Sequence, residues 1–223
     1  MPKLKSARHH WWPRCVSSRW AAEDGTTGWI KPDGSSVRVP PQKLGLIGNA
    51  HHIKLGRHPG DSTHWDTSFE NVFDTADRNF PSVISWLESL SYEFMPHPDL
   101  RSRFLAQPAD DSQLRLLTEC VVSLAVRGPM NREASVALAE RLRGPIPNPE
   151  RDSLIGSNMR QSQRLIADSI GANGKFAVLW SHGREFIFGD GFFHNVKAIV
   201  NSPFGPKILA PITPTMSVIV SRP

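Results

Sequence analysis

Five ionisable residues in this chain have the side-chain types that a hydrolytic site requires: His10, Glu70, Asp77, Arg127 and Asp190. An imidazole that titrates near neutral pH acts as a base or as a metal ligand. Carboxylates hold divalent cations, and a guanidinium group pairs with phosphate. We therefore predict catalytic roles for His10, Asp77, Asp190 and Arg127, with Mg²⁺ or Mn²⁺ held by Glu70, Asp77 and Asp190.

Glu70, Asp74 and Asp77 are spaced at i, i+4 and i+7, so a helix would present them as one column. Like charges at this spacing repel unless a cation, an arginine or water relieves them. One interpretation of the column is a metal-ligand set or an acid–base pair. The other is a solvated column at the edge of the core, where Arg78 is the only local base.

The remaining candidates each have a structural interpretation beside the chemical one. His10 precedes two tryptophans and a proline, which favours an extended chain and fits either a catalytic histidine or one that caps or satisfies the core. Asp190 follows residues 186–189, for which we predict a buried strand, and it fits either a catalytic carboxylate or a turn. Arg127 ends an apolar helix, where it pairs with an acid, contacts a phosphate or compensates the helix dipole.

The net charge of +5 hides an uneven distribution. Residues 1–60 contain ten basic and three acidic side chains, residues 61–100 one basic and eight acidic, and residues 101–223 fifteen basic and ten acidic. Basic flanks around an acidic centre are typical of a protein that processes a polyanion, because cations attract phosphates while carboxylates hold a metal. The alternative is that the acidic block is a solvated helix face.

Trp11, Trp12 and Arg14 are the residues that we expect to contact nucleic acid, since tryptophans stack on bases and arginine binds phosphate. No apolar stretch reaches the roughly 18 residues that a membrane helix needs. Cys15 and Cys120 are far apart and do not form a disulfide framework, so we expect a cytoplasmic protein.

The elements that must position these residues follow from apolar spacing. Phe69, Phe73, Ala76 and Phe80 recur at helical spacing, and Leu114, Leu117, Val121 and Leu124 mark a second helix that ends at the Gly128–Pro129 pair. A hairpin over residues 29–39 and strands over 176–180, 185–189, 208–210 and 218–220 complete the prediction.

We therefore predict one α+β domain over residues 1–223, with residues 1–60 extended, 65–171 helical and 176–223 rich in strands. The N-terminal hairpin and the C-terminal strands are expected to share one sheet, because each is too small to bury its own face.

Several short motifs together resemble one family. They are His-x-x-Pro at 10–13, the glycine-rich and aromatic hairpin at 24–34, the helix carrying Glu70 and Asp77, Arg127-x-Pro129, residues 186–190, and Pro-Ile-Thr-Pro at 211–214. This set resembles the bacterial domain-of-unknown-function family numbered 4238, although that family has Asp-x-Pro where this chain has Asp190-Gly191-Phe192, and a glutamate at the position of Asp77. The resemblance implies a bacterial or phage-related soluble protein, such as a toxin or a defence effector.

Two functions fit these observations. The first is a metal-dependent hydrolase acting on RNA or DNA, a nuclease-type effector in which His10 and the acids share one cleft. The second is a non-catalytic protein that binds nucleic acid or a protein partner through its basic segment and its tryptophans. The proximity of the predicted catalytic side chains distinguishes the two.

Overall fold

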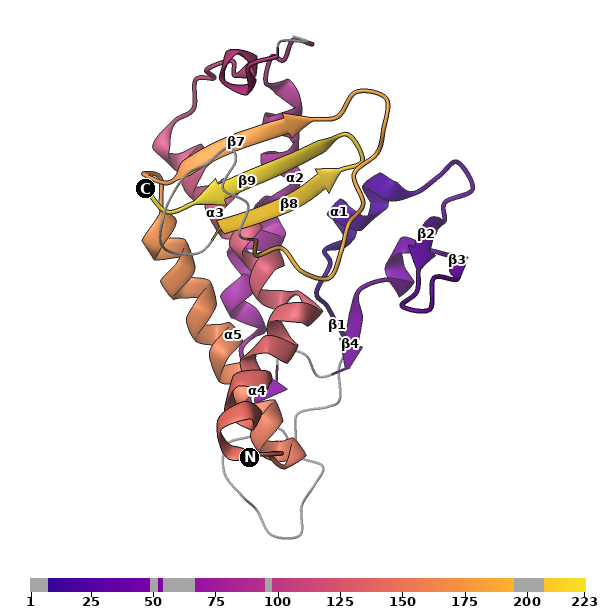
Figure 1. The fold of residues 1–223 in the computed structure, drawn as a ribbon, viewed down its shortest axis with the longest axis vertical. Helices are drawn as coiled ribbons and strands as arrows, with labels where there is room; N and C mark the ends of the chain where they lie inside the picture. The colour runs from indigo at the N-terminus through magenta and orange to yellow at the C-terminus, as the bar shows by residue number, and fades with distance from the viewer. Residues whose placement is uncertain (1–7, 49–51, 54–66, 95–97, 195–206) are drawn as a thin grey trace.

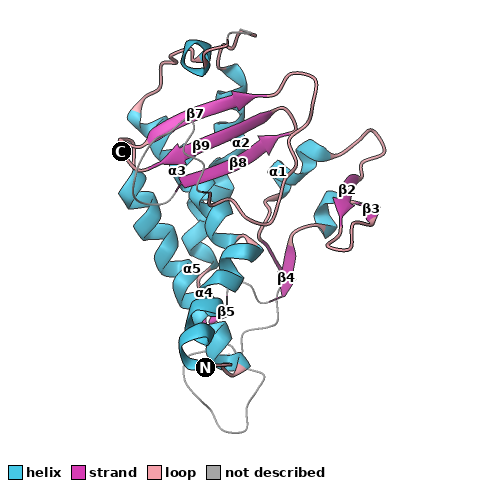
Figure 2. Cartoon of the chain, in the orientation of Figure 1, coloured by secondary structure: helices cyan, strands magenta, loops and turns pink. Residues whose placement is uncertain are grey.

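The computed structural model describes residues 8–48, 52–53, 67–94, 98–194 and 207–223. The long helices follow one another in the middle of the chain, and most of the strands lie toward its two ends. Figure 2 distinguishes the helices from the strands by colour. The helices are α1 (Arg14–Ser17), α2 (Asp74–Ser89), α3 (Asp111–Arg127), α4 (Pro129–Arg143) and α5 (Asn148–Ile170), with 3-10 turns η1 (Ser18–Trp20), η2 (Pro41–Lys43), η3 (Glu70–Phe73) and η4 (Leu100–Arg103). The strands are β1 (Arg8–His10), β2 (Thr27–Ile30), β3 (Ser36–Val39), β4 (Leu46–Gly48), β5 (His52–Ile53), β6 (Thr67–Ser68), β7 (Lys175–Trp180), β8 (Lys207–Thr213) and β9 (Met216–Ser221).

Helices α2 and α3 form the core because each has an apolar stripe at helical spacing. Pro81 lies inside α2, and the helix continues through it to Ser89. Helix α3 starts at a capping box in which the Asp110 side chain accepts from the Gln113 backbone at 2.8 Å. It ends at Gly128, as the sequence predicts, and Pro129 begins α4.

Helix α5 begins at Asn148. Pro149 suits this position, because proline in the first turn of a helix has no hydrogen bond to lose. The α5 helix then packs on α3, where buried Gln163 donates to the Glu119 carboxylate at 2.8 Å. This contact fixes the rest of α5 against the core.

The main sheet has the antiparallel order β7-β9-β8 and lies across α2 and α3 (Figure 1). Alternate residues of its strands face the helices, among them Val178 of β7, Val218 of β9 and Ala210 of β8, which are cross-strand partners. The central strand β9 is buried along its whole length. The sheet and the two helices therefore bury a common apolar layer.

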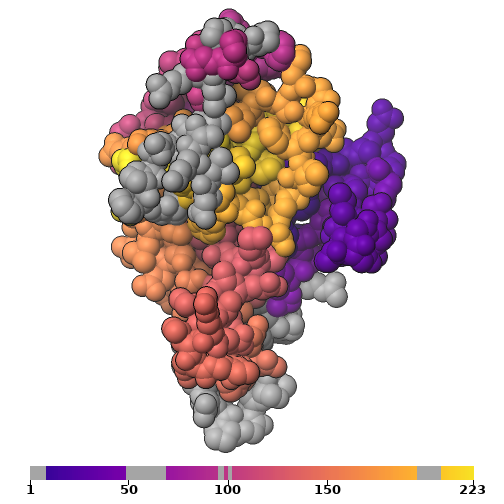
Figure 3. All heavy atoms as spheres, viewed as in Figure 1, coloured from indigo at the N-terminus to yellow at the C-terminus, as the bar shows by residue number. Residues whose placement is uncertain are grey.

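The α+β class is confirmed, and one core cluster runs from Trp12 to Val220. The expectation of a shared sheet is wrong, because β2 pairs with β3 and the C-terminal strands form a sheet of their own. The two ends of the chain meet instead through side chains: the Trp20 indole Nε1 donates to the Phe186 carbonyl at 2.9 Å. Figure 3 shows the N-terminal residues, in indigo, lying against the orange loop.

Residues 185–189 are not a strand, which corrects a second prediction. Ile187 is highly exposed, whereas Phe188 packs against the core, so the apolar residues of this segment are not buried on both faces. The segment has no ladder partner in the described ranges. It acts instead as an aromatic contact for the N-terminal segment.

Candidate functional site

Asp77 and Arg127 lie together, and they form an ion pair. The Arg127 guanidinium donates from Nη2 to Asp77 Oδ1 at 2.7 Å and from Nη1 to Oδ2 at 3.1 Å. The Arg127 side chain is 1% exposed and the Asp77 side chain 44% exposed, so the pair lies at the boundary of the core. Arg127 also covers the Phe73 ring, with its Cζ 4.8 Å from the ring centroid.

The other two acids of the column have basic side chains of their own as partners. Asp74 pairs with Arg78 one turn away at 3.2 Å, and the Oε2 atom of Glu70 lies 3.7 Å from Nε2 of His9. Among the described residues no three histidines, cysteines or acids are grouped to hold a metal ion. Each acid of the column therefore has an arginine or a histidine beside it.

His10 and Asp190 do not join this pair. His10 lies on β1 opposite Leu46, and its buried Nδ1 has no hydrogen-bond partner in the described part of the chain. Asp190 is exposed at the end of a loop, and it is its backbone carbonyl that makes a contact, by accepting from Met130 N at 3.1 Å. The predicted buried strand that would have aimed the Asp190 carboxylate into a cleft does not exist.

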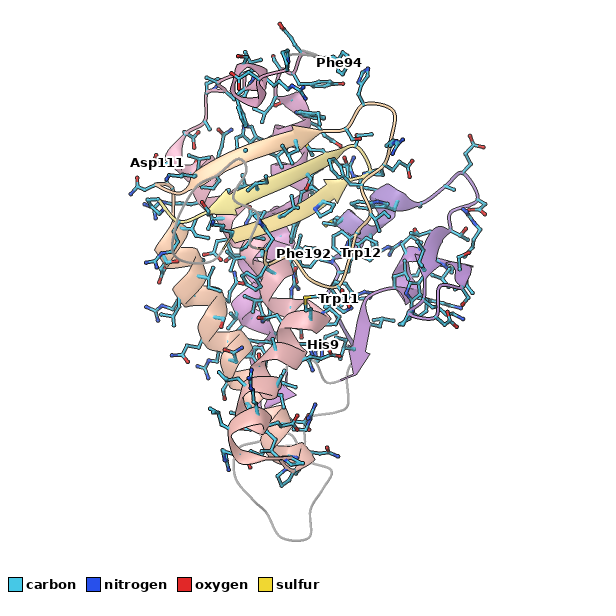
Figure 4. The ribbon with its side chains drawn as sticks, viewed as in Figure 1. His9, Trp11, Trp12, Phe94, Asp111 and Phe192 are labelled. Atoms are coloured by element: carbon cyan, nitrogen blue, oxygen red, sulfur yellow. The ribbon has the colours of Figure 1, made fainter. Side chains whose placement is uncertain are left out.

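The residues predicted to contact nucleic acid differ in their exposure. Trp12 is only 7% exposed, and its ring stacks on Phe188 with centroids 4.0 Å apart, so it offers no face to a base. Trp11 lies half-buried in the same cluster, 6.0 Å from Phe188. Arg14 is exposed on α1. Figure 4 shows Trp11 and Trp12 close to Phe192, where the N-terminal segment meets the loop.

Cys15 lies beside the ion pair. Burial raises the pKa of the Cys15 thiol, and the Asp77 carboxylate raises it further. A thiol with a raised pKa holds little thiolate at neutral pH, so Cys15 does not have the character of an activated nucleophile.

A groove of about 670 Å³ lies elsewhere, at the free edge of the main sheet. One wall is β7 from Phe176 to Trp180, and the floor comes from α2 and α3 through Trp86, Leu114 and Leu117. The opposite wall comes from residues 90–94 and 103–109. No sequence motif marks this region, because the groove exists only once the loop and the strand are brought together.

The outer wall of the groove exposes large apolar side chains. Tyr92, Phe94, Phe104 and Leu105 are all exposed, and Tyr92 stacks on Trp180 with centroids 4.3 Å apart. A bond from the Gln107 amide to the Ser91 carbonyl at 2.8 Å ties the two parts of this wall together. The sequence feature that could have indicated this wall is a group of aromatic residues in a segment without helical or strand periodicity.

The groove is electrically neutral. Its lining contains one acid, Glu93, and one base, Arg103, and the other lining residues carry no formal charge. A polyanion gains its affinity from several cations that replace counterions. The lining therefore suits an apolar and uncharged ligand better than a nucleic-acid backbone.

The edge of β7 that faces the groove has backbone groups with which no described segment pairs. Ser181 N donates to Thr215 O at 2.8 Å, which makes this pair a hydrogen-bonded one in the β7–β9 ladder. Because hydrogen-bonded pairs alternate along an antiparallel ladder, the backbone groups of Phe176, Val178 and Trp180 point away from β9. Within the described ranges, no backbone hydrogen bond joins them to another segment.

The opposite edge of the sheet is covered. His194 N donates to Lys207 O at 3.1 Å, and Leu209 N donates to Phe192 O at 2.9 Å, so a loop pairs with the outer side of β8. Folded proteins commonly cover sheet edges in this way. The fold thus covers the edge of β8, whereas no described segment pairs with the edge of β7 beside the apolar groove.

Comparisons with models of protein families, with curated proteins and with solved structures find no match for this chain. None of the helices in the described ranges is long and apolar enough to cross a membrane.

Proposed function

We propose that this chain is a non-catalytic interaction protein that binds an apolar segment of a protein partner in the groove beside β7. The observation that supports this most strongly is the exposure of Tyr92, Phe94, Phe104 and Leu105 around a neutral groove of about 670 Å³. A contiguous exposed apolar surface with aromatic residues is typical of a binding site. The cytoplasm is the compartment that the two free thiols, Cys15 and Cys120, fit best.

The metal-dependent nuclease and the resemblance to family 4238 stay predictions. The carboxylates give the nuclease little support, because both oxygens of Asp77 are bound by Arg127 and a cation would have to displace a buried guanidinium. Binding of RNA or DNA through stacked tryptophans is likewise weakened by the burial of Trp12. Of the two functions that fit the sequence, the geometry favours the non-catalytic one, but through the groove beside β7 and not through the basic segment and the tryptophans.

The proposal is tested by selecting peptides from a random displayed library against the whole chain and measuring their affinity by calorimetry. Leu105 is 48% exposed, so a partner can still bury about half of its surface, which contributes about 1 kcal/mol. Leu105→Ala should therefore weaken the selected peptides about fivefold.

Leu142→Ala is the matched control, because Leu142 is also an exposed leucine and lies on α4, far along the chain from the groove. Its affinity for the peptides should equal that of the unmodified protein. Equal losses for the two variants, or the failure of any peptide to bind, would contradict the proposed function.

A further inference from the structure

We propose that the partner binds as an extended strand paired antiparallel to the free edge of β7, with its apolar side chains at every second residue directed into the groove. This inference rests on the proposed function and adds the conformation and the side-chain pattern of the partner. The occupant is an extended polypeptide segment.

The hydrogen-bonding groups of the free edge select an extended backbone. Phe176, Val178 and Trp180 each present one N–H donor and one carbonyl acceptor, at a spacing of two residues. A neighbouring strand about 4.8 Å away repeats its own donors and acceptors at that same spacing. A partner that reaches this edge as a strand therefore satisfies groups that no other described segment of the chain satisfies.

The side-chain pattern of the partner follows from the face of the sheet on which the groove lies. Phe176, Val178 and Trp180 are the cross-strand partners of Val220, Val218 and Met216, which are buried against the helices. Residues directly opposite each other in a ladder have side chains on the same face.

The partner residues that bond to this edge therefore point their side chains toward the same inner face. There they meet the floor of the groove, formed by Trp86 and Leu117, and the exposed ring of Phe104. The intervening residues point toward the outer face and can be polar. The recognised sequence is thus an alternation of apolar and polar or small residues.

The neutral lining favours the same kind of partner. One acid and one base, Glu93 and Arg103, leave no net charge to attract a polyanion or a strongly charged peptide. Affinity then comes from main-chain hydrogen bonds and selectivity from the alternate apolar positions, which is the mode known as strand addition.

The probe for this inference is a synthetic peptide that repeats the sequence Met-Ser-Val-Ile-Val-Ser of β9 between terminal lysines. This sequence already pairs antiparallel with β7 on its other edge, and its apolar Met and Val residues alternate with Ser and Ile. Binding to the whole chain is measured by calorimetry and by the fluorescence of Trp86 and Trp180. Saturable binding is expected.

Two N-methylated forms of the peptide test the pairing. Methylation of the amides of the Met and Val residues removes the donors that face β7, so the affinity should fall by more than about tenfold. Methylation of the intervening Ser and Ile amides places the methyl groups on the far edge, so the affinity should stay within about twofold of the parent peptide.

A pair of proline variants tests the same edge from the protein side. Val178→Pro removes a donor that faces the groove, which an edge strand tolerates, and it should weaken the parent peptide by more than about tenfold while the chain stays folded. Ala177→Pro removes a donor that faces β9, at the Ala177–Ile219 pair, and should lower the melting temperature more than Val178→Pro does. If Val178→Pro also unfolds the chain, the methylated peptides decide the question.

The outcomes separate this inference from the proposed function. If both methylated peptides bind as tightly as the parent and Leu105→Ala weakens all of them, the groove binds apolar segments but strand addition is wrong. If N-methylation weakens the selected peptides as it should weaken the probe, but the probe itself does not bind at all, strand addition holds and the expected alternation of apolar and polar residues is wrong. If neither the probe nor any selected peptide binds, the proposed function itself fails.

Discussion

Replacing Asp77 with alanine should destabilise the protein, and this prediction follows from one ion pair. Arg127 is the largest fully buried side chain described, and its Nη1 and Nη2 atoms both donate hydrogen bonds to the Asp77 carboxylate. Without that carboxylate, the guanidinium keeps a bond to the Ser123 carbonyl at 3.3 Å and its contact with the Phe73 ring. Neither of these neutralises its charge.

The magnitude follows from the burial of the two partners. Removing one member of a fully buried pair costs about 3–5 kcal/mol, because the remaining charge is left without compensation. Asp77 is 44% exposed, so water enters beside the truncated side chain and replaces part of the lost interaction. We therefore expect a loss of about 2–3 kcal/mol, which lowers the melting temperature of a chain of this size by about 5–10 °C.

The assay is thermal and urea unfolding of Asp77→Ala beside a control from the same helix, Asp74→Ala. The Asp74–Arg78 pair is exposed on both sides, so its removal should cost less than about 1 kcal/mol. A double-mutant cycle with Arg127→Met should return a coupling energy of at least about 1 kcal/mol. Equal stabilities for the two aspartate variants would refute the reasoning. If Asp77→Ala is as stable as the unmodified chain, the result would instead favour a catalytic or metal-binding role for the Asp77 carboxylate.

Three further outcomes are expected. Trp12→Ala should lower the free energy of unfolding by about 3–5 kcal/mol in urea titrations, whereas Trp29→Ala, which removes an exposed ring, should change it by less than about 1 kcal/mol. The hydrogen bonds from Thr26, and then from Arg38, lower the pKa of Asp24 from 3.8 to about 2. The contribution of the Asp24 carboxylate to stability is therefore complete above pH 3.8 and is lost as the pH falls through about 2. The NMR signal of the Thr26 amide should titrate with that lower midpoint. Cys120, whose pKa is raised by burial, should react with a thiol reagent only after unfolding, as peptide mass mapping can check.

The helical middle could be predicted because its information is local. The stripe of Phe69, Phe73, Ala76 and Phe80 places four buried side chains along η3 and α2, and the Gly128–Pro129 pair ends one helix and starts the next. The hairpin β2–β3 was also recognisable from the turn that contains Gly34, whose φ is +82°.

The errors concern contacts between segments far apart in the chain. Residues 185–189 have the composition of a strand, but Trp12 and Trp20 supply an aromatic surface that holds Phe188 without a ladder. The partner of Asp77 was one of several arginines in the sequence, and the spacing of 50 residues between Asp77 and Arg127 gives no local signal. Arg78, the only local base of the carboxylate column, does pair with Asp74, whereas the partners of Glu70 and Asp77 come from segments far away in the sequence.

The groove could not be predicted, because its two walls come from β7 and from residues 90–109, and neither wall has a recognisable motif. What the sequence does contain is a group of aromatic residues between α2 and α3, which the structure exposes. Such residues in a segment without periodicity indicate a surface that is kept for contact.

Amide hydrogen exchange of β7 is the measurement that tests the central claim most directly. In the free protein, the amides of Phe176, Val178 and Trp180 should exchange quickly and those of Ala177 and Leu179 slowly, because only the latter bond to β9. Saturation with the probe peptide should slow the first three to the rate of the other two. Three amides that are already protected in the free chain, or that stay unprotected in the presence of bound peptide, would contradict a free edge that receives a partner strand.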